Sequence, residues 1–328
     1  AKSGTVPINQ RRERLRVLAQ AELRRRCGGD DRWAEAGPLK AAITKLWPTQ
    51  KAVALVDRFL PGPRGKRRVW TAADQFLVDE ANTLLDGTPF TYGHVVVDEA
   101  QDHSAVALRV IGRRTPAGSC TLVGDVAQST TPAGQERWED VFAHLGMSGT
   151  TAELTIGYRV PEPILAVANR LLPITGVDAT ASRSVRSVGA PPAVVRATDV
   201  ATATADTVVA TKHRHKLTGV VAPDALHDDL AAALAGYGLT AVDHVHELGH
   251  DDVPLFGPES VKGLEFDGVV VVNPHEILGS DARGARLLYV AMTRAVQELT
   301  FVTDAPLPPV VCRDLAGPGR PNRDIQQL

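Results

Sequence analysis

The stretch His94-Val-Val-Val-Asp-Glu-Ala-Gln-Asp102 decides the fold, because a short apolar strand ends there on two adjacent carboxylates. A strand without polar residues is typical of a parallel sheet that is covered on both faces. In open parallel sheets, ligands bind beyond the carboxyl ends of the strands. Asp98 is therefore a candidate for holding Mg²⁺, and Glu99 for activating water in phosphoryl transfer. The alternative interpretation is a helix-capping pair, since acidic residues favour helix starts.

Apolar strands alternate with helices on both sides of this stretch, which predicts an α/β fold with parallel sheets. The expected strands are 95–97, 120–123, 154–156, 193–195, 218–221, 269–272 and 299–302. The expected helices are 71–85, 104–114, 161–172, 202–212, 224–235 and 285–295, and residues 5 to about 60 are also expected to be helical, with breaks at Cys27–Asp30 and Trp47-Pro48. Thr71 is the expected N-cap of the first helix in the list. A loop is expected over Pro61–Lys66.

Length and composition indicate a globular protein of about two domains. The chain has 328 residues, of which 44% are hydrophobic and 23% charged. It has no apolar run near the roughly 20 residues of a membrane span, so no membrane partner is expected. Cys27, Cys120 and Cys312 are far apart, which argues against a disulfide framework and a zinc site. This cysteine usage predicts a cytoplasmic location.

Positive charge is concentrated near the start of the chain. Residues 1–80 carry 17 Lys and Arg against 9 Asp and Glu, although the whole chain has a net charge of −2. Seven arginines lie between Arg11 and Arg26 on a predicted helix, whose apolar side is expected to consist of Leu15, Leu18, Ala21 and Leu23. This helix either presents a solvated face or meets nucleic acid or an acidic protein.

Four further segments carry residues suited to nucleotide chemistry. An amide that can sense a terminal phosphate follows a strand in Gly124-Asp125-Val-Ala-Gln128, and Tyr158-Arg159 sets a flat ring beside a guanidinium. Lys262-Gly263-Leu-Glu265 runs into the strand 269–272, and Arg294 ends a predicted helix. A guanidinium that stabilises transition-state charge contributes about 10³–10⁵ in rate in related hydrolases.

In order and spacing, these segments over about residues 90–305 resemble motifs II to VI of superfamily 1 helicases of the UvrD/Rep type. The resemblance implies two RecA-like motor domains of the P-loop NTPase fold that use ATP and Mg²⁺. The resemblance implies that Asp98 binds Mg²⁺, that Glu99 is the catalytic base and that Gln128 couples the γ-phosphate to movement. It implies that Tyr158 stacks on adenine, that Arg159 and Arg294 contact the γ-phosphate and that Glu265 binds the ribose. It also implies further nucleotide-binding positions at Asp125, Lys262 and Gly263.

The chain departs from the family pattern in several places. It contains no GxxxxGK[ST] phosphate loop, and Gly62–Arg67 has the wrong spacing and lacks the hydroxyl. We therefore expect the C-terminal part of a longer ATP-hydrolysing motor that is inactive alone, with a degenerate site as the alternative. Thr130-Thr131-Pro132 replaces the aromatic residues that would stack on single-stranded DNA. Glu259 stands where the family often has a histidine that contacts DNA.

These departures, together with Leu46-Trp47-Pro48, Gly157–Pro161 and Ser184–Ser187, resemble the actinobacterial HelD (helicase IV-like) proteins. That family implies RNA polymerase core as the partner, release of stalled polymerase and, in some members, relief of rifamycin inhibition. The expected domains are 1–88, a helical segment that ends an insertion arm; 89–150, the rest of motor domain 1 with motifs II and III; 151–305, motor domain 2; and 306–328, an irregular tail.

Two other functions compete with remodelling of RNA polymerase. One is a 3′–5′ DNA helicase or translocase, and the other is a non-hydrolysing binding module that retains the motor fold. Weak binding of nucleic acid by this chain is compatible both with remodelling of RNA polymerase and with the DNA helicase or translocase. His213, His215, His244, His246 and His250 suggest a metal site, but solvated or capping histidines are the default interpretation.

Overall fold

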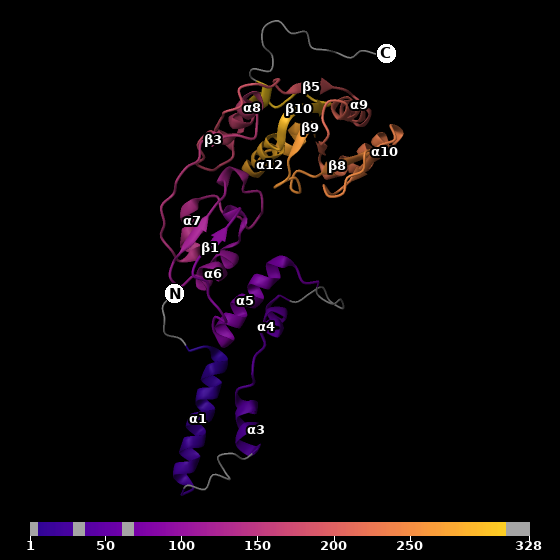
Figure 1. Ribbon diagram of the computed structural model, residues 1–328. Helices are drawn as coiled ribbons and strands as arrows, with labels where there is room; N and C mark the ends of the chain where they lie inside the picture. The colour runs from indigo at the N-terminus through magenta and orange to yellow at the C-terminus, as the bar shows by residue number, and fades with distance from the viewer. Residues whose placement is uncertain (1–5, 29–36, 61–68, 313–328) are drawn as a thin grey trace. The chain divides into compact units, whose positions relative to one another are not determined.

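The computed structural model describes residues 6–28, 37–60 and 69–312, and the chain divides into two compact units. Unit 1 comprises Ala1–Val123 and Glu139–Gly149, and unit 2 comprises Gly124–Trp138 and Thr150–Leu328 (Figure 1). The segment Gly124–Trp138, which we assigned to the first motor domain, is thus grouped with unit 2. The predicted loop over Pro61–Lys66 and most of the predicted tail, residues 313–328, lie outside the described residues.

Unit 1 combines helices with a small parallel sheet. Its elements are α1 (Ile8–Arg26), α3 (Gly37–Leu46), α4 (Ala52–Phe59), α5 (Ala72–Asp86), β1 (Val95–Val97), the 3₁₀ helix η1 (Ala100–Asp102), α6 (Ala105–Arg114), β2 (Cys120–Leu122) and nearly all of α7 (Trp138–Leu145). Strands β1 and β2 pair in parallel. The predicted cap of α5 is confirmed: the Thr71 hydroxyl accepts from Asp74 N, and the Asp74 carboxylate accepts from Thr71 N. Helix α7 was not predicted.

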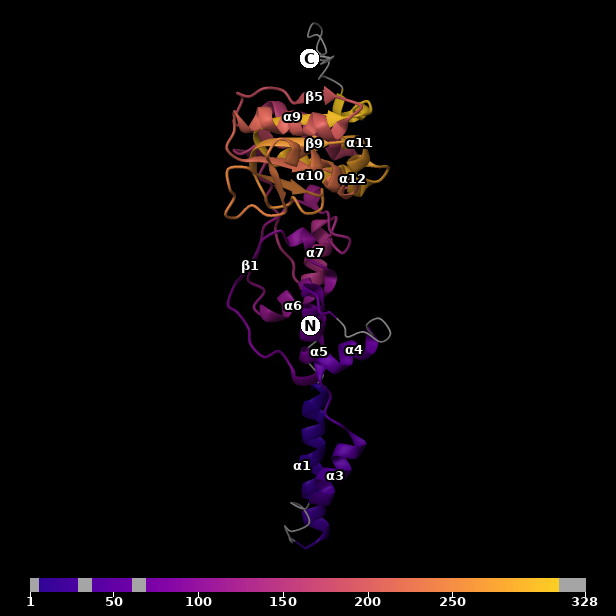
Figure 2. The same ribbon diagram turned by 90° about the vertical axis from the view of Figure 1, so that its right-hand side faces the viewer.

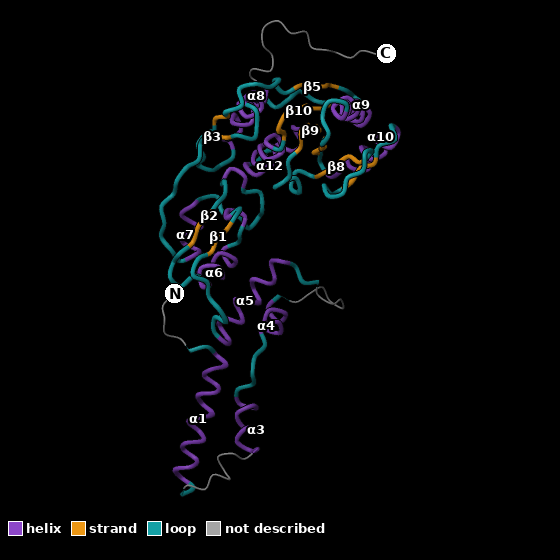
Figure 3. The backbone as a smooth tube through the Cα atoms, viewed as in Figure 1, coloured by secondary structure: helices purple, strands orange, loops and turns teal. Residues whose placement is uncertain are grey.

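Helix α1 buries none of its residues, so the expected apolar side of this helix is wrong. Leu15 is 39% exposed and Leu18 is 61% exposed. Polar contacts attach α1 to the rest of unit 1: Arg12 Nε donates to Trp47 O at 2.9 Å, and Asn9 Nδ2 donates to Asp86 Oδ1 at 2.8 Å. Figure 3 shows α1 beside α3 as two separate rods.

Unit 2 is built on a six-stranded sheet with the order β5-β10-β9-β6-β8-β7, in which every pairing is parallel. Its strands are β5 (Ala193–Arg196), β6 (Thr218–Val221), β7 (Thr240–Val242), β8 (Asp252–Phe256), β9 (Phe266–Val272) and β10 (Ala295–Thr303), with β3 (Ile156–Gly157) and β4 (Arg183–Ser184) in a separate parallel pair. Its helices are η2 (Val126–Gln128), α8 (Glu162–Ala168), η3 (Asn169–Ile174), α9 (Val200–Lys212), η4 (Asp224–Leu226), α10 (His227–Gly236), α11 (Pro274–Leu278), α12 (Ala282–Thr293) and α13 (Pro309–Cys312). The predicted α/β class with parallel sheets is confirmed.

Strand β9 shows how the sequence dictates this arrangement. Val269 and Val271 are buried in one core with residues of α8 and α12, while Val270 and Val272 are buried in a second core with residues of α9 and α10. Because successive side chains of a strand point to opposite faces, an unbroken apolar run requires helices on both sides. Figure 1 shows α12 and α9 on opposite sides of the strands, and Figure 2 views the sheet from the side that α9 and α10 cover.

Several predicted boundaries differ from the structure. The helix expected over 161–172 changes to 3₁₀ geometry at Asn169, and the helix expected over 285–295 ends at Thr293 because Ala295 already belongs to β10. Strands β4, β7 and β8 were not predicted. β8 contains Pro254, and proline within an apolar run argues against a central strand because it donates no hydrogen bond. Four residues of the expected irregular tail form α13.

Candidate functional site

The acidic pair of unit 1 lies at the carboxyl end of β1, as predicted. Asp98 follows the strand directly, and Glu99 adopts the left-handed conformation with φ of 49° at the start of η1. Asp98 Oδ1 accepts from Glu99 N at 2.9 Å, and Gln101 Nε2 donates to Glu99 Oε2 at 2.7 Å. A left-handed non-glycine residue costs about 1–3 kcal/mol, and such strain concentrates at functional sites. The helix-capping interpretation is not what the structure shows for Glu99, whose side chain makes no capping bond in η1.

Asp98 is a carboxylate of the kind that can hold Mg²⁺ together with other ligands. Magnesium in phosphoryl-transfer sites is held by one or two carboxylates together with water and the phosphates of the substrate. Asp98 is exposed and supplies one such carboxylate. Backbone bonds from Val123 N to Val97 O and from Ala100 N to Val123 O fix the end of β2 against this turn, at 2.8 Å and 3.0 Å. The turn is therefore rigidly attached to the small sheet of unit 1.

Within unit 2, the structure brings together four predicted site residues from three separate segments. Asp125 caps η2 and accepts from Gln128 Nε2 at 3.0 Å. Gln128 O accepts from Lys262 Nζ at 2.6 Å, and Gln128 Oε1 accepts from Arg294 Nη2 at 3.2 Å. Gln128 is thus the centre of a network that joins η2, the turn before β9 and the end of α12.

Arg294 is held rigidly in this network. The residue is only 7% exposed, and its guanidinium donates to Val290 O, Leu264 O and Thr293 Oγ1 at 3.1, 3.4 and 3.1 Å. A buried guanidinium must be hydrogen-bonded, because burying a charge without partners is costly. These carbonyl acceptors and the Gln128 amide fix the position of the positive charge.

Tyr289 of α12 lies five residues before Arg294, and the charges of Asp125 and Arg294 both act on it. Burial raises the pKa of its phenol strongly, and the negative charge of Asp125 raises that pKa further, whereas Arg294 opposes the shift. The phenol therefore stays protonated near neutral pH. Sequence reasoning passed over this residue, although it lies within the segment that we had singled out around Arg294.

The other predicted residues of unit 2 form a second, more exposed group. Tyr158 is 73% exposed and follows β3, so its ring is open to a stacking partner. Arg159 Nη1 lies 2.7 Å from Glu265 Oε1. Gly263 has φ of +78°, a conformation that favours glycine in the turn between Lys262 and Glu265. The structure therefore pairs two residues that the family resemblance assigned to different parts of the nucleotide.

Two arginines of α12 contact the segment Gly124–Trp138, and the sequence analysis missed both. Arg283 Nε donates to Thr130 O at 2.9 Å, and Arg286 Nη2 donates to Glu136 Oε1 at 2.8 Å. Arg283, Arg286, Val290 and Arg294 follow a helical spacing of three or four residues, which places them along one side of α12. Charged residues on a helix that is otherwise buried were the signal for this contact.

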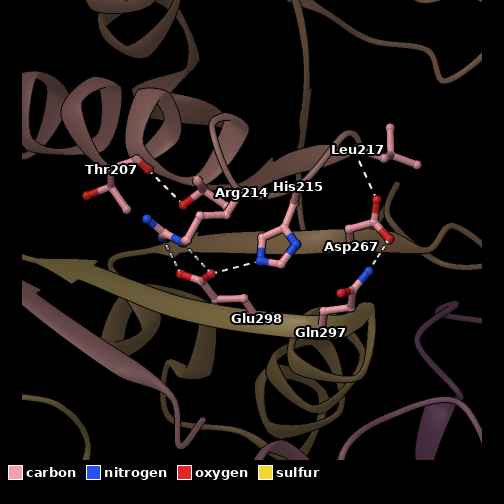
Figure 4. Close-up of polar contacts among 8 residues, drawn as sticks. Thr207, Arg214, His215, Leu217, Asp267, Gln297 and Glu298 are labelled. Carbon is pink, nitrogen blue, oxygen red and sulfur yellow. Dashed lines mark hydrogen bonds and ion pairs between the residues drawn. The ribbon is translucent and has the colours of Figure 1, made fainter. Parts of the chain in front are cut away.

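A further polar cluster joins the end of α9 to the first halves of β9 and β10 (Figure 4). Glu298 accepts from Arg214 Nη2 at 2.6 Å and contacts His215 Nε2 at 2.8 Å. Asp267 accepts from Leu217 N at 3.2 Å and from Gln297 Nε2 at 2.8 Å. The hydrogen bond from Arg214 lowers the pKa of Glu298. These contacts attach α9 to the sheet, which gives His215 a structural role.

The histidine pairs do not form a metal site. In the described ranges, no group of three or more His, Cys, Asp and Glu side chains is arranged to hold a metal ion. His244 contacts Asp243, and His250 contacts Asp251, in each case its neighbour in sequence. Among helices of the described residues, none is long and apolar enough to cross a membrane.

A segment of unit 2 that contains the turn before β9, the strand itself and α12 is similar to one known domain family. Residues 259–302 match the UvrD-like helicase C-terminal domain. The UvrD-like match contains Lys262, Gly263, Glu265 and Arg294, together with Arg283 and Arg286. It begins at Glu259, and it ends within β10.

Comparison with whole proteins adds a description of one similar structure. No curated protein matches the chain. A solved structure described as the C-terminal domain of a possible DNA helicase from Lactobacillus plantarum WCFS1 is 24% identical, with 48% of this chain and 93% of that chain covered and a TM-score of 0.38.

Proposed function

We propose that this chain forms part of an ATP-driven motor of the UvrD-like helicase type. The observation that carries the proposal is the convergence of Lys262, Arg294 and Gln128, which brings two cations and an amide from three segments of unit 2 into one network. The UvrD-like match over 259–302 supports it, because the match contains both cations. The strained Glu99 turn at the end of β1 provides a separate carboxylate pair.

Each group has a chemical task in this proposal. Asp98 would hold Mg²⁺, which when bound neutralises charge on the phosphates. Glu99 would accept a proton from the attacking water, and Arg294 and Arg159 would stabilise charge that develops on the transferred phosphoryl group. Tyr158 would stack on adenine, Glu265 would bind the ribose hydroxyls, and Asp125, Lys262 and Gly263 would shape the turns that surround the nucleotide.

The finer proposal concerns what the motor acts on, and we propose remodelling of RNA polymerase. Two observations favour a track other than single-stranded DNA. Ser129 and Thr130 are buried against unit 2 and supply no aromatic ring for base stacking. Glu259 offers a phosphate backbone no positive charge, and its ion pair at 2.7 Å engages the nearby cation of Arg283. Relief of rifamycin inhibition would be a consequence of such remodelling in the proteins this chain resembles.

The second candidate is a 3′–5′ DNA helicase or translocase. The UvrD-like helicase match favours it, because the matched segment is named for helicases. The arginines of α1 provide positive charge that a DNA backbone could contact. A non-hydrolysing module is the third alternative, and it predicts that no variant of Glu99 changes nucleotide turnover in the intact protein.

A binding experiment distinguishes the two tracks. The intact protein is tested for capture by purified RNA polymerase core and, separately, by single-stranded DNA at near-physiological salt. Remodelling of polymerase predicts tight binding to the core enzyme and weak binding to DNA. Strong binding to DNA that weakens steeply with added salt, without capture by the polymerase, would support the translocase instead.

A further inference from the structure

The segment Gly124–Trp138, which we call the connector segment, is attached to unit 2 by side chains of α12. Its backbone is held at Thr130 O by Arg283, and its side chain Glu136 is held by Arg286. These contacts lie further along the connector segment than those of Lys262 and Arg294, which both bind Gln128. Four cations of unit 2 therefore hold the connector segment at three positions.

Each of the two contacts, Arg283 with Thr130 and Arg286 with Glu136, is supported by a second acceptor of the same guanidinium. Arg286 is 7% exposed, and its Nη1 donates to Thr175 O at 2.7 Å, so its guanidinium is fixed before it reaches Glu136. The Glu136 side chain is 56% exposed. Arg283 is oriented by Glu259, which accepts from Nη2 at 2.7 Å while Nε donates to Thr130 O. In both cases a second acceptor determines where the guanidinium points.

The connector segment is joined covalently to unit 1 at both of its ends. The connector segment follows Val123 and precedes Glu139, and both of these residues belong to unit 1. A segment of unit 2 that is covalently continuous with unit 1 at both ends is thus bound by side chains of α12. Arg283 contacts the backbone two residues beyond Gln128, and Arg286 contacts the Glu136 side chain further along the same segment.

We propose that Arg283 and Arg286 are positioning residues that lock the connector segment onto α12 and thereby set the position of Gln128. The attachment itself depends only on the contacts of unit 2. In the motor, the attachment would also pass movement through Val123 to the acidic pair Asp98 and Glu99. This second role rests on the proposed motor function. Arg283 and Arg286 touch no reacting atom in this account; they act through the backbone of the connector segment.

Amide hydrogen exchange of the whole chain tests the attachment without any need for ATP hydrolysis. The reporters are the amides of Ala127, Gln128, Ser129 and Gly134, which are hydrogen-bonded within the connector segment. Glu136→Gln and Arg283→Gln should speed their exchange about tenfold or more, because opening of the segment no longer has to break a charged contact. Amides of β9 in the same variants should exchange within twofold of the unmodified chain.

Three further variants make the result decisive. Arg283→Lys should restore protection, since an ammonium has three donors and can serve Thr130 O and Glu259 together. Arg214→Gln removes a charged pair of similar length elsewhere in unit 2 and should leave the connector segment unchanged. Arg286→Gln should act like Glu136→Gln, and if it unfolds the chain, the exposed Glu136 still provides the test.

Unchanged exchange of the connector segment in Glu136→Gln and Arg283→Gln would overturn the proposal. An equal rise in β9 and the connector segment would also overturn it, because it would show general destabilisation. In the intact motor, Arg283→Gln should lower kcat for ATP with little change in KM, as expected when Gln128 is misplaced only in the transition state. Faster exchange with normal ATP turnover would retain the attachment and remove its part in the motor, so the two claims fail separately.

Discussion

Arg159 and Glu265 form an ion pair in which Nη1 and Oε1 are 2.7 Å apart. Both residues belong to the group that we propose to contact the nucleotide, so the pair has to share its charges with a ligand or open. The Arg159 side chain is largely exposed, and an exposed pair contributes little to stability, about 0–1 kcal/mol. Opening the pair therefore costs little compared with the free energy that nucleotide binding provides.

The pair yields a prediction about kinetics in the intact motor. Arg159→Ala should lower kcat by about 10³-fold or more, because the transition-state charge loses a guanidinium. Glu265→Gln should raise KM for ATP a few-fold and change kcat by less than about threefold, since a ribose contact binds the ground state and the transition state equally. Steady-state ATPase assays of both variants measure this. Equal effects on kcat would remove the division of roles between the two residues.

Glu99→Gln should separate binding from turnover. The amide keeps the size of the side chain and its contact with Gln101, but it cannot accept a proton from water. The intact motor with this substitution should bind ATP with an affinity within about threefold of the unmodified protein and hydrolyse it at least about 10²-fold more slowly. Equilibrium binding and a single-turnover assay give the two numbers. Hydrolysis at the normal rate would exclude Glu99 as the base.

The Glu298 cluster predicts how stability depends on pH. The hydrogen bond from Arg214 lowers the pKa of Glu298 in the folded chain, so the unfolded chain binds a proton more readily. The stabilisation is present above the unfolded pKa of about 4.3 and is lost as pH falls through the folded pKa. Glu298→Gln should cost about 1 kcal/mol at neutral pH and nothing in strong acid.

Urea unfolding followed at neutral pH and near pH 3 tests this expectation, with the two pH values chosen on either side of the unfolded pKa of about 4.3. Asp267→Asn is a useful comparison, because its carboxylate accepts from a backbone N–H and an amide in the same cluster, and neither donor carries a charge. A constant difference between Glu298→Gln and the unmodified chain at both pH values would contradict the assignment.

Gly219 predicts a packing limit in the six-stranded sheet. A Cβ at this position of β6 would lie 2.7 Å from Phe266 Cδ1, and the Phe266 ring is buried in the core beside α12. Gly219→Ala should therefore destabilise unit 2 by about 1–3 kcal/mol, the usual cost of overpacking. Gly236→Ala is the matched control: no atom lies within 4 Å of the added carbon at the end of α10, so it should be neutral or stabilising by up to about 1 kcal/mol. Equal denaturation midpoints for the two variants would contradict this account.

Much of the sheet could be predicted because its strands are short apolar runs. The four valines at 269–272 require cover on both faces, and β6 was predicted at Thr218–Val221 with the boundaries that the structure shows. β8 could not be predicted, because Pro254 interrupts the run and its pairing depends on neighbours distant in sequence. The exposed Leu15 and Leu18 of α1 show the converse: a helical pattern of apolar residues does not guarantee a partner to bury them.

The candidate site was predictable as a set of residues and not as a set of contacts. The order of the motifs singled out Gln128, Lys262 and Arg294, and the structure brings these three together. The attachment of the connector segment through Arg283 and Arg286 depends on how this segment folds onto α12, and no local sequence pattern specifies that fold. The pairing of Arg159 with Glu265 could not be predicted for the same reason. Arg159 follows β3 and Glu265 precedes β9, so the pair depends on how these distant segments fold together.

The central claim is that the network around Gln128 serves ATP hydrolysis, and Arg294 tests it most directly. Single-turnover hydrolysis of ATP is measured for the intact motor, for Arg294→Gln and for Arg214→Gln as a control cation of unit 2 outside the network. The account predicts that Arg294→Gln slows hydrolysis by about 10³-fold or more, while Arg214→Gln stays within about threefold of the unmodified protein. Hydrolysis by Arg294→Gln at the rate of the control would contradict it.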